Sequence, residues 1–304
     1  MTDVAQAVLL REHNHSSLAE FKTYLAALSD PRERAIAETA FVFGVKAQLE
    51  PEHVVVLVHG INTDAEWQEA LADQIRAECG LITYVIGYGN YHPVHFLWPY
   101  WNTRKGPIDR VIEQLRVIVA EKPGVRISVI AHSFGTYIIS KVLSQCADLS
   151  FHRIQLCGAV VEAQFKWELV RGKFTQLVND VGTRDVWPIL AKQSTWGYGD
   201  GGAFGFKNTV CHDRHFDYKH SDFMTPEHFS AYWKPYLVDG EIVTSAWTKQ
   251  RKAAGWKVKF LRNFPAKYLL WWVVIPTITL LITGGAAWCV IRLFKLVLHW
   301  IGLS

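Results

Sequence analysis

The sequence has few cysteines, and their arrangement does not indicate a zinc site or a disulfide framework. The five cysteines are scattered between Cys79 and Cys289, and no two of them stand in C-x-x-C spacing. An odd and dispersed set of this kind is typical of small, buried side chains in a reducing compartment. The sequence therefore does not predict a disulfide-stabilised secreted domain.

The N-terminus also lacks the pattern of a secretory signal. Its apolar stretch is only a few residues long, with Asp3 before it and Arg11 and Glu12 close behind. A signal peptide needs a longer apolar centre behind a basic start. Internal repeats and low-complexity linkers are missing as well, and half of the residues are apolar. This composition excludes a disordered or collagen-like chain and predicts a folded protein with a sizeable core.

Acidic residues are absent after Glu241. Residues 242–304 contain nine Lys and Arg residues and no Asp or Glu, so this tail carries a charge of +9. The residues before it hold 23 basic and 28 acidic side chains and carry −5. The overall charge of +4 therefore hides two parts of opposite sign, which call for separate interpretation.

The basic tail contains an uncharged stretch of 24 residues, from Tyr268 to Ile291. As a helix this stretch would extend about 36 Å, enough to cross a hydrocarbon core of about 30 Å. Tryptophans near both ends are typical of membrane helices, which also tolerate Pro276 and the pair Gly284-Gly285. We expect a transmembrane helix over 268–291. The alternative is a buried hairpin broken at Gly284-Gly285.

The charges around this stretch predict its orientation. Seven of the nine basic residues precede the stretch and two follow it. Basic flanks remain on the cytoplasmic side of a membrane. We therefore expect a single-pass membrane protein with a basic juxtamembrane segment at 241–267, a tail at 292–304 and a large N-terminal part facing the cytoplasm. Anionic lipid headgroups, and not nucleic acid, are the expected partner of the basic segment.

Before residue 241 the sequence alternates between apolar runs and helical patterns. Residues 53–58 form a continuous apolar run, which is typical of a parallel strand buried on both faces. Further strands are predicted at 82–87, 126–131, 154–159 and 174–179, with helices after Thr63 and at 107–121 and 134–147. Strands that alternate with helices predict βαβ units and a parallel sheet with its site at the carboxyl ends of the strands. We expect an α/β domain over 51–240, preceded by a helical extension over 1–50.

A serine stands where the strand at 126–131 gives way to a helix. The sequence there is Ala131-His-Ser133-Phe-Gly135. It resembles the nucleophile elbow of the α/β-hydrolase superfamily, a G-x-S-x-G turn that holds a serine on a strained corner between strand and helix. Ala131 replaces the first glycine, as in some bacterial lipases. The resemblance implies an α/β-hydrolase fold, a mostly parallel central sheet flanked by helices, with Ser133 as the nucleophile.

The resemblance also implies an acid and then a histidine later in the chain. Asp185, in a loop after the last predicted strand, fits the position of the acid, and Asp180 at the end of that strand is the alternative. His220 stands in a His-Ser-Asp-Phe sequence similar to that of related bacterial hydrolases and is the expected base. His228 is the alternative base.

An oxyanion that forms during acyl transfer needs backbone N–H donors. By resemblance to these enzymes, one donor is Phe134, directly after the nucleophile. The other is Ile61, in the His59-Gly-Ile-Asn turn after the first strand. His59 itself is expected to be a structural residue of that turn.

Other motifs predict less. The pairs His92-x-x-His95 and His212-x-x-His215 have no third ligand in a recognisable pattern, so we expect no metal. The glycine-rich stretch 197–205 lacks the Lys-Ser/Thr of a phosphate loop and is expected to be a turn near the site. The aromatic stretch Tyr91–Asn102 could cover the site, shape an apolar acyl pocket or simply pack as a loop.

The sequence thus predicts a membrane-anchored serine hydrolase that cleaves a carboxylic ester, with a lipid as the candidate substrate. No cofactor is implied, and no oligomeric state is predicted. A thioesterase or amidase would use the same triad. A catalytically silent hydrolase fold that serves as a scaffold or binding module at the membrane is the alternative from a different class.

Overall fold

The structure is a computed structural model, and it describes residues 18–39, 51–60, 66–88, 96, 102–249 and 256–300. The chain divides into two compact units, Met1–Glu52 and His53–Ser304. In the first unit, α2 (Leu18–Ala27) and a helix over 31–39 share a small core around Phe21 and Ala37.

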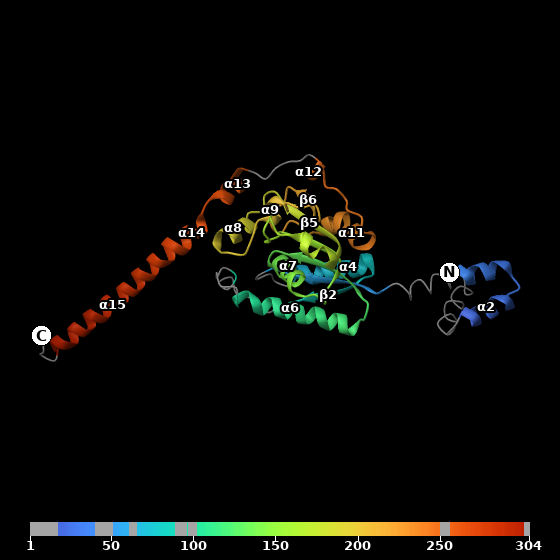
Figure 1. The fold of residues 1–304 in the computed structure, drawn as a ribbon, viewed down its shortest axis with the longest axis horizontal. Helices are drawn as coiled ribbons and strands as arrows, with labels where there is room; N and C mark the ends of the chain where they lie inside the picture. The colour runs from blue at the N-terminus through green and yellow to red at the C-terminus, as the bar shows by residue number, and fades with distance from the viewer. Residues whose placement is uncertain are drawn as a thin grey trace. The chain divides into compact units, whose positions relative to one another are not determined.

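The second unit is built on a parallel sheet (Figure 1). Within the described residues the sheet has six strands in the order β2-β1-β3-β4-β5-β6, and all five pairings are parallel. The prediction of a mostly parallel sheet flanked by helices is confirmed. The strands are β1 (His53–Val58), β2 (Ile82–Ile86), β3 (Arg126–His132), β4 (Phe151–Cys157), β5 (Phe174–Gly182) and β6 (His212–Phe216).

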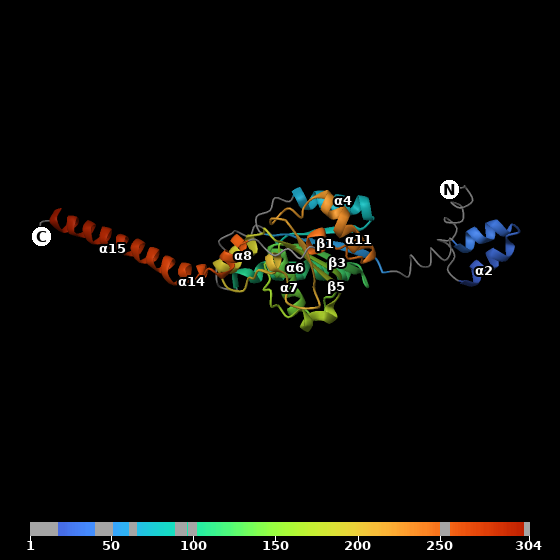
Figure 2. The ribbon, with the colours of Figure 1, turned by 90° about the horizontal axis from the view of Figure 1, so that it is seen from above.

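Helices cover both faces of this sheet (Figure 2). The side chains of Val54, Val56 and Val58 pack in the core shared with α6 (Asn102–Glu121) and α7 (Phe134–Gln145). Those of Val55 and Leu57 pack in the core shared with α4 (Glu66–Cys79) and α11 (Lys234–Asp239). Successive side chains of a strand point to opposite faces, so β1 has to be apolar at each of its buried positions, Val54 to Val58.

Strand β6 was not predicted from the sequence. It reads His-Asp-Arg-His-Phe, and its central residue Arg214 is completely buried. A strand with charged residues at its centre lacks the apolar pattern on which the prediction relied. Arg214 is buried because Asp180 on neighbouring β5 neutralises it, with Nε 2.7 Å from Oδ1.

Short helices follow β4, β5 and β6, and those after β6 lead to the C-terminal helix. They are η1 (Trp167–Lys173), α8 (Trp187–Ser194), α9 (Gly201–Phe204), α10 (Pro226–His228), the π-helical turn η2 (Phe229–Trp233), α12 (Ala246–Lys249) and α13 (Trp256–Asn263). Val258 of α13 packs in a cluster with Ile189 of α8 and Ala203 of α9. Arg262 Nε lies 2.7 Å from Asp200 Oδ2. The segment predicted as juxtamembrane therefore folds partly onto the α/β domain.

The C-terminal helix runs without a break through α14 (Ala266–Leu269), the π-helical turn η3 (Leu270–Val274) and α15 (Ile275–Trp300). The π turn ends two residues before Pro276, which lacks the N–H of a regular helix. Among the described residues, Ala266–Gly285 is the one helix long and apolar enough to cross a membrane, and none of it is buried. The alternative of a buried hairpin is wrong, because the helix continues through Gly284 and Gly285.

Candidate active site

Ser133 occupies a strained corner between β3 and α7. Its backbone has φ 54° and ψ −120°, and among the described residues it is the one residue other than glycine with a positive φ. The corner is held by its neighbours. Ser133 N donates to Cys157 O at 3.1 Å, and Thr136 Oγ1 donates to Ser133 O at 2.6 Å. Strained conformations of this kind persist where the surroundings fix them, and they are typical of nucleophile elbows.

Two glycines allow the backbone to approach Ser133 closely. A Cβ at Gly135 would lie 2.2 Å from Val58 O, so α7 begins in direct contact with the end of β1. A Cβ at Gly60 would lie 2.7 Å from Ser133 Cβ. The turn after β1 therefore passes directly beside the serine, where an oxyanion donor would be needed.

Gly135→Ala should destabilise the fold by about 3 kcal/mol, because the new methyl group overlaps the Val58 carbonyl and helix and strand must separate. The free energy of unfolding in urea measures this effect. Gly172→Ala is the matched control, since a Cβ there has no neighbour within 4 Å. Equal stability of the two variants would contradict the close approach.

Asp185 and His220 form a hydrogen-bonded pair near the carboxyl end of the sheet. His220 Nδ1 lies 2.8 Å from Asp185 Oδ2, and the Asp185 side chain is completely buried. Asp185 Oδ1 accepts a hydrogen bond from Trp187 N at 3.0 Å, which fixes the carboxylate. An acid at this position holds the imidazole ring through Nδ1 and leaves Nε2 for proton transfer.

The end of β4 brings His220 toward the serine. Gly158 has φ 55°, and a Cβ there would lie 2.8 Å from His220 Cε1. Gly158 follows Cys157, whose carbonyl accepts the hydrogen bond from Ser133 N. In the part of the chain described, no hydrogen bond joins Ser133 Oγ to His220. Such contacts often tighten only in the complex with substrate.

His132, next to the nucleophile, contacts the loop of His220. Its Nε2 lies 3.0 Å from the carbonyl oxygen of His220, and the two rings are 4.6 Å apart. Burial lowers the pKa of His132 to about 3, so its ring stays neutral and donates from Nε2. Sequence reasoning missed both His132 and Gly158, because the motif treats position 132 as variable and gives no signal for position 158.

The alternative acid and the alternative base contact each other. Asp180 Oδ2 lies 2.9 Å from His228 Nε2 and 2.8 Å from Trp233 Nε1, and Asp180 also pairs with Arg214. Burial alone would raise the pKa of Asp180, but Arg214 and His228 outweigh it and lower the pKa to about 2. This cluster is completely buried and ties β5 to β6 and to η2. Its geometry favours a structural role for both residues.

The oxyanion donors are described in part. Phe134 is the first residue of α7, and N–H groups of a first helical turn have no acceptor inside the helix. Ile61 lies outside the described residues. His59 is stacked on Tyr88, with ring centroids 4.6 Å apart, and Tyr88 Oη donates to His59 O at 3.0 Å. These contacts agree with a structural role for His59 in the turn.

The parts of the remaining motifs that the structure describes do not form a second site. His92 and His95 lie outside the described residues, and within them no group of three metal-ligating side chains is found. The glycine-rich stretch packs on the segment after β4, since a Cβ at Gly202 would lie 2.1 Å from Ala159 N. Of the aromatic stretch, the structure describes Phe96 and the backbone of Asn102, the first residue of α6. The Phe96 ring lies 5.6 Å from that of Phe134.

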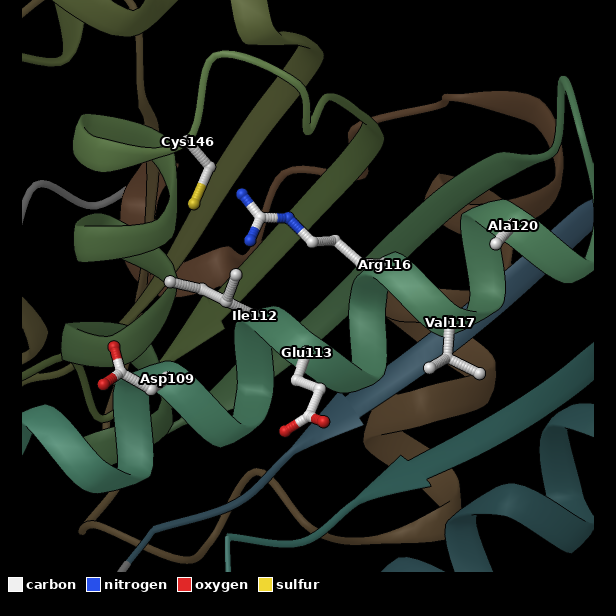
Figure 3. A pocket seen from close by; sticks show the side chains of 7 residues that line it. All are labelled: Asp109, Ile112, Glu113, Arg116, Val117, Ala120 and Cys146. Carbon is white, nitrogen blue, oxygen red and sulfur yellow. The ribbon is translucent and has the colours of Figure 1, made fainter.

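A groove of 460 Å³ lies along α6 (Figure 3). Cys146, which lines it, follows the last residue of α7, whereas Ser133 precedes the first. A helix of this length separates the two by about 18 Å. The groove also borders Arg116, which is paired with Asp148 at 2.8 Å. It is therefore not a substrate pocket for Ser133.

Histidines whose pKa is lowered in the folded protein predict that the protein loses stability in acid. Burial lowers the pKa of His53 and of His152 to about 4 and that of His132 to about 3. The unfolded chain therefore binds more protons than the folded one below pH 6.5, so the stability present above pH 6.5 is lost as the pH falls toward 4. Asp213 acts in the opposite direction, because burial raises its pKa to about 6.

The pKa values of His59, His212 and His215 are lowered by burial as well, so six histidines act against Asp213. With allowance for solvent screening of the half-exposed rings, the free energy of unfolding should fall by roughly 2 kcal/mol or more between pH 7.5 and pH 5. Urea titrations at the two pH values measure this change. His53→Gln should make the loss smaller, since it removes one of the shifted groups. An unchanged pH dependence in this variant would contradict the role of His53.

Comparison with known proteins gives a family match over part of the chain. Residues 48–164 match the family model described as "Putative serine esterase (DUF676)", and the matched part contains Ser133. No curated protein matches the chain.

Two solved structures are similar at low identity. A cutinase-like protein from Cryptococcus sp. is 10% identical, with 64% of this chain and 97% of that chain covered and a TM-score of 0.39. TT1662 from Thermus thermophilus is 11% identical, with 59% and 85% covered and a TM-score of 0.37. The family match, and not these structures, supports a serine ester hydrolase, as the sequence predicted.

Proposed function

We propose that the chain is a membrane-anchored serine hydrolase that cleaves a carboxylic ester through an acyl-enzyme, with Ser133, His220 and Asp185 as its triad. The observation that carries this proposal is the strained corner at Ser133 beside the hydrogen-bonded pair His220 and Asp185. A nucleophile, a base and an orienting acid are the three groups that acyl transfer requires.

In the first half of the reaction, Ser133 Oγ attacks the carbonyl carbon of the ester while its proton passes to His220 Nε2. The carbonyl oxygen becomes an oxyanion and accepts hydrogen bonds from the N–H groups of Phe134 and Ile61. When the tetrahedral intermediate collapses, the bond to the leaving oxygen breaks and His220 gives its proton to the departing alcohol. The acyl group is then bonded to Ser133.

In the second half, a water molecule attacks the acyl carbon and gives a proton to His220. The intermediate collapses, the bond to Ser133 Oγ breaks, and Ser133 recovers its proton from His220. The products are the carboxylic acid and the free enzyme. Asp185 keeps the ring of His220 oriented throughout and stabilises the imidazolium through Nδ1.

The anchor is the helix that begins at Ala266. Its apolar side chains are exposed to solvent, among them Leu280, Leu281 and Ile282, which are each about two-thirds exposed. A soluble domain has no reason to present such a helix to water, whereas a bilayer would cover it. The excess of basic residues before the helix supports a cytoplasmic position of the α/β domain.

A fluorophosphonate probe tests the catalytic part of the proposal. The probe should form a covalent adduct with the full-length protein, and peptide mass spectrometry should place the adduct on Ser133. A screen of p-nitrophenyl esters of increasing acyl length would then define the substrate class. A folded protein that neither labels nor hydrolyses any ester would instead support the scaffold alternative.

Truncation after Pro265 should give a protein that is soluble without detergent and still reacts with the probe. The cut retains α13, because Val258 packs in the core of the α/β domain and Arg262 pairs with Asp200. Truncation after Ser245 should be less stable for the same reason. Flotation with vesicles checks the anchor: full-length protein that stays in the aqueous fraction would contradict it.

A further inference from the structure

Helix α8 is apolar on two opposite faces. Its inner face, with Pro188, Ile189 and Ala191, is buried against the α/β domain. Its outer face presents Trp187, 59% exposed, and Leu190, 39% exposed, one turn apart. A helix on the surface of a soluble domain normally presents polar residues outward. Two large apolar side chains on its outer face indicate a surface that contacts a membrane or another protein.

The first turn of α8 contacts two residues of the proposed triad. Trp187 N donates to Asp185 Oδ1, and the Trp187 ring lies 6.2 Å from the ring of His220. An exposed tryptophan therefore stands beside the proposed base.

The other end of α8 is attached to the candidate membrane helix. Trp271 Nε1, within that helix, donates to the carbonyl oxygen of Ser194, the last residue of α8, at 2.6 Å. Trp196, 36% exposed, packs against Tyr268 and Trp271, with ring centroids 6.3 and 6.4 Å away. Because α8 is about 12 Å long, the triad acid is held close to the start of the apolar helix.

The residues at this junction are of the types that lie in the interface of a bilayer. Lys267 Nζ is 5.8 Å from the Trp196 ring and 5.4 Å from the Tyr268 ring. Tryptophan, tyrosine and lysine gather where acyl chains meet headgroups. The chain has no acidic residue after Glu241, so this side attracts anionic lipids.

We propose that the outer face of α8, formed by Trp187 and Leu190, together with Trp196 just after the helix, rests on the headgroup layer of the bilayer that holds the C-terminal helix. The opening of the active site then lies at the lipid surface, and the substrate is an ester that enters from the leaflet. This inference depends on the proposed function, because it needs both the triad and the anchor. It adds the surface through which the enzyme meets its substrate.

Leu190→Glu tests this surface in the full-length protein, because it adds a negative charge to the outer face and leaves the triad intact. Leu169→Glu is the matched control, since Leu169 lies in η1, is 80% exposed and belongs to no described core cluster. Each protein is reconstituted into vesicles of phosphatidylcholine with one quarter phosphatidylglycerol. Two substrates share a leaving group: 4-methylumbelliferyl butyrate in the water phase and 4-methylumbelliferyl palmitate in the vesicles.

We expect Leu190→Glu to lower turnover of the palmitate about tenfold while butyrate turnover stays within about twofold, because anionic headgroups repel the new carboxylate. Leu169→Glu should leave both rates within about twofold. An unchanged ratio of the two rates in Leu190→Glu would overturn the docking surface. If wild-type protein cleaves neither ester, the proposed function fails instead.

A second measurement does not depend on activity or on the charge variant. Leu190→Cys and Leu169→Cys are made with Cys79 and Cys289 replaced by serine, and each is labelled with the fluorophore NBD. Vesicles that contain nitroxide-labelled lipids should quench the fluorophore at position 190 and leave the one at position 169 bright. Equal quenching at the two positions would overturn the proposal even if Leu190→Glu fails to fold.

Discussion

Ser133→Ala should lower kcat/KM for p-nitrophenyl butyrate by about 10⁴-fold or more and abolish labelling by the fluorophosphonate probe. The substitution removes the one atom that forms the acyl bond. The activity that remains would come from binding and from the oxyanion donors. The variant should keep the stability of the wild type, because the described contacts of Ser133 are made by its backbone.

Ser144→Ala is the matched control for this experiment. Ser144 lies on the same helix, with its hydroxyl bonded to Ser140 O at 2.7 Å, and faces the surface near the other end of α7. It should label and turn over like the wild type. Substantial turnover by folded Ser133→Ala would exclude Ser133 as the nucleophile, and labelling of that variant would place the reactive residue elsewhere.

The fold was predictable where its physical causes are local. The apolar run of β1 is visible in the sequence because both faces of that strand are buried. The elbow is visible because Gly135 contacts the Val58 carbonyl, and this contact leaves no room for a larger residue. In both cases the residues that determine the local structure lie within one short segment. The structure of that segment can therefore be inferred from the sequence.

The parts that were missed depend on partners far away in the chain. Strand β6 appears polar because Arg214 is neutralised by Asp180, a residue 34 positions earlier on another strand. The position of His220 depends on Gly158, directly after β4, and on His132, the last residue of β3, and neither has a fixed spacing to it. The order of residues along the chain indicates which acids and which histidines are candidates for the triad. Choosing between two candidates for each needs the three-dimensional contacts.

Asp185→Asn and Asp180→Asn should therefore fail in different ways. Asp185→Asn should lower kcat by about 10⁴-fold with little loss of stability. The asparagine oxygen can still accept the hydrogen bond from Trp187 N, but the amide group opposite His220 Nδ1 favours the wrong tautomer and no longer stabilises the imidazolium. Probe labelling should slow in parallel, because it requires the same activated serine.

Asp180→Asn should instead destabilise the fold by about 3 to 5 kcal/mol, because Arg214 then remains charged in a completely buried site without its counter-ion. The effect should persist at every pH above about 4, since the low pKa of Asp180 keeps it charged in the wild type throughout that range. Urea titration gives the stability, and active-site titration with the probe gives kcat per folded molecule.

That kcat should stay within about tenfold of the wild type, because the Asp180 carboxylate contacts Arg214, His228 and Trp233 and not His220. The reverse pattern, a stable but inactive Asp180→Asn beside an active Asp185→Asn, would assign the triad acid to Asp180 and make His228 its base.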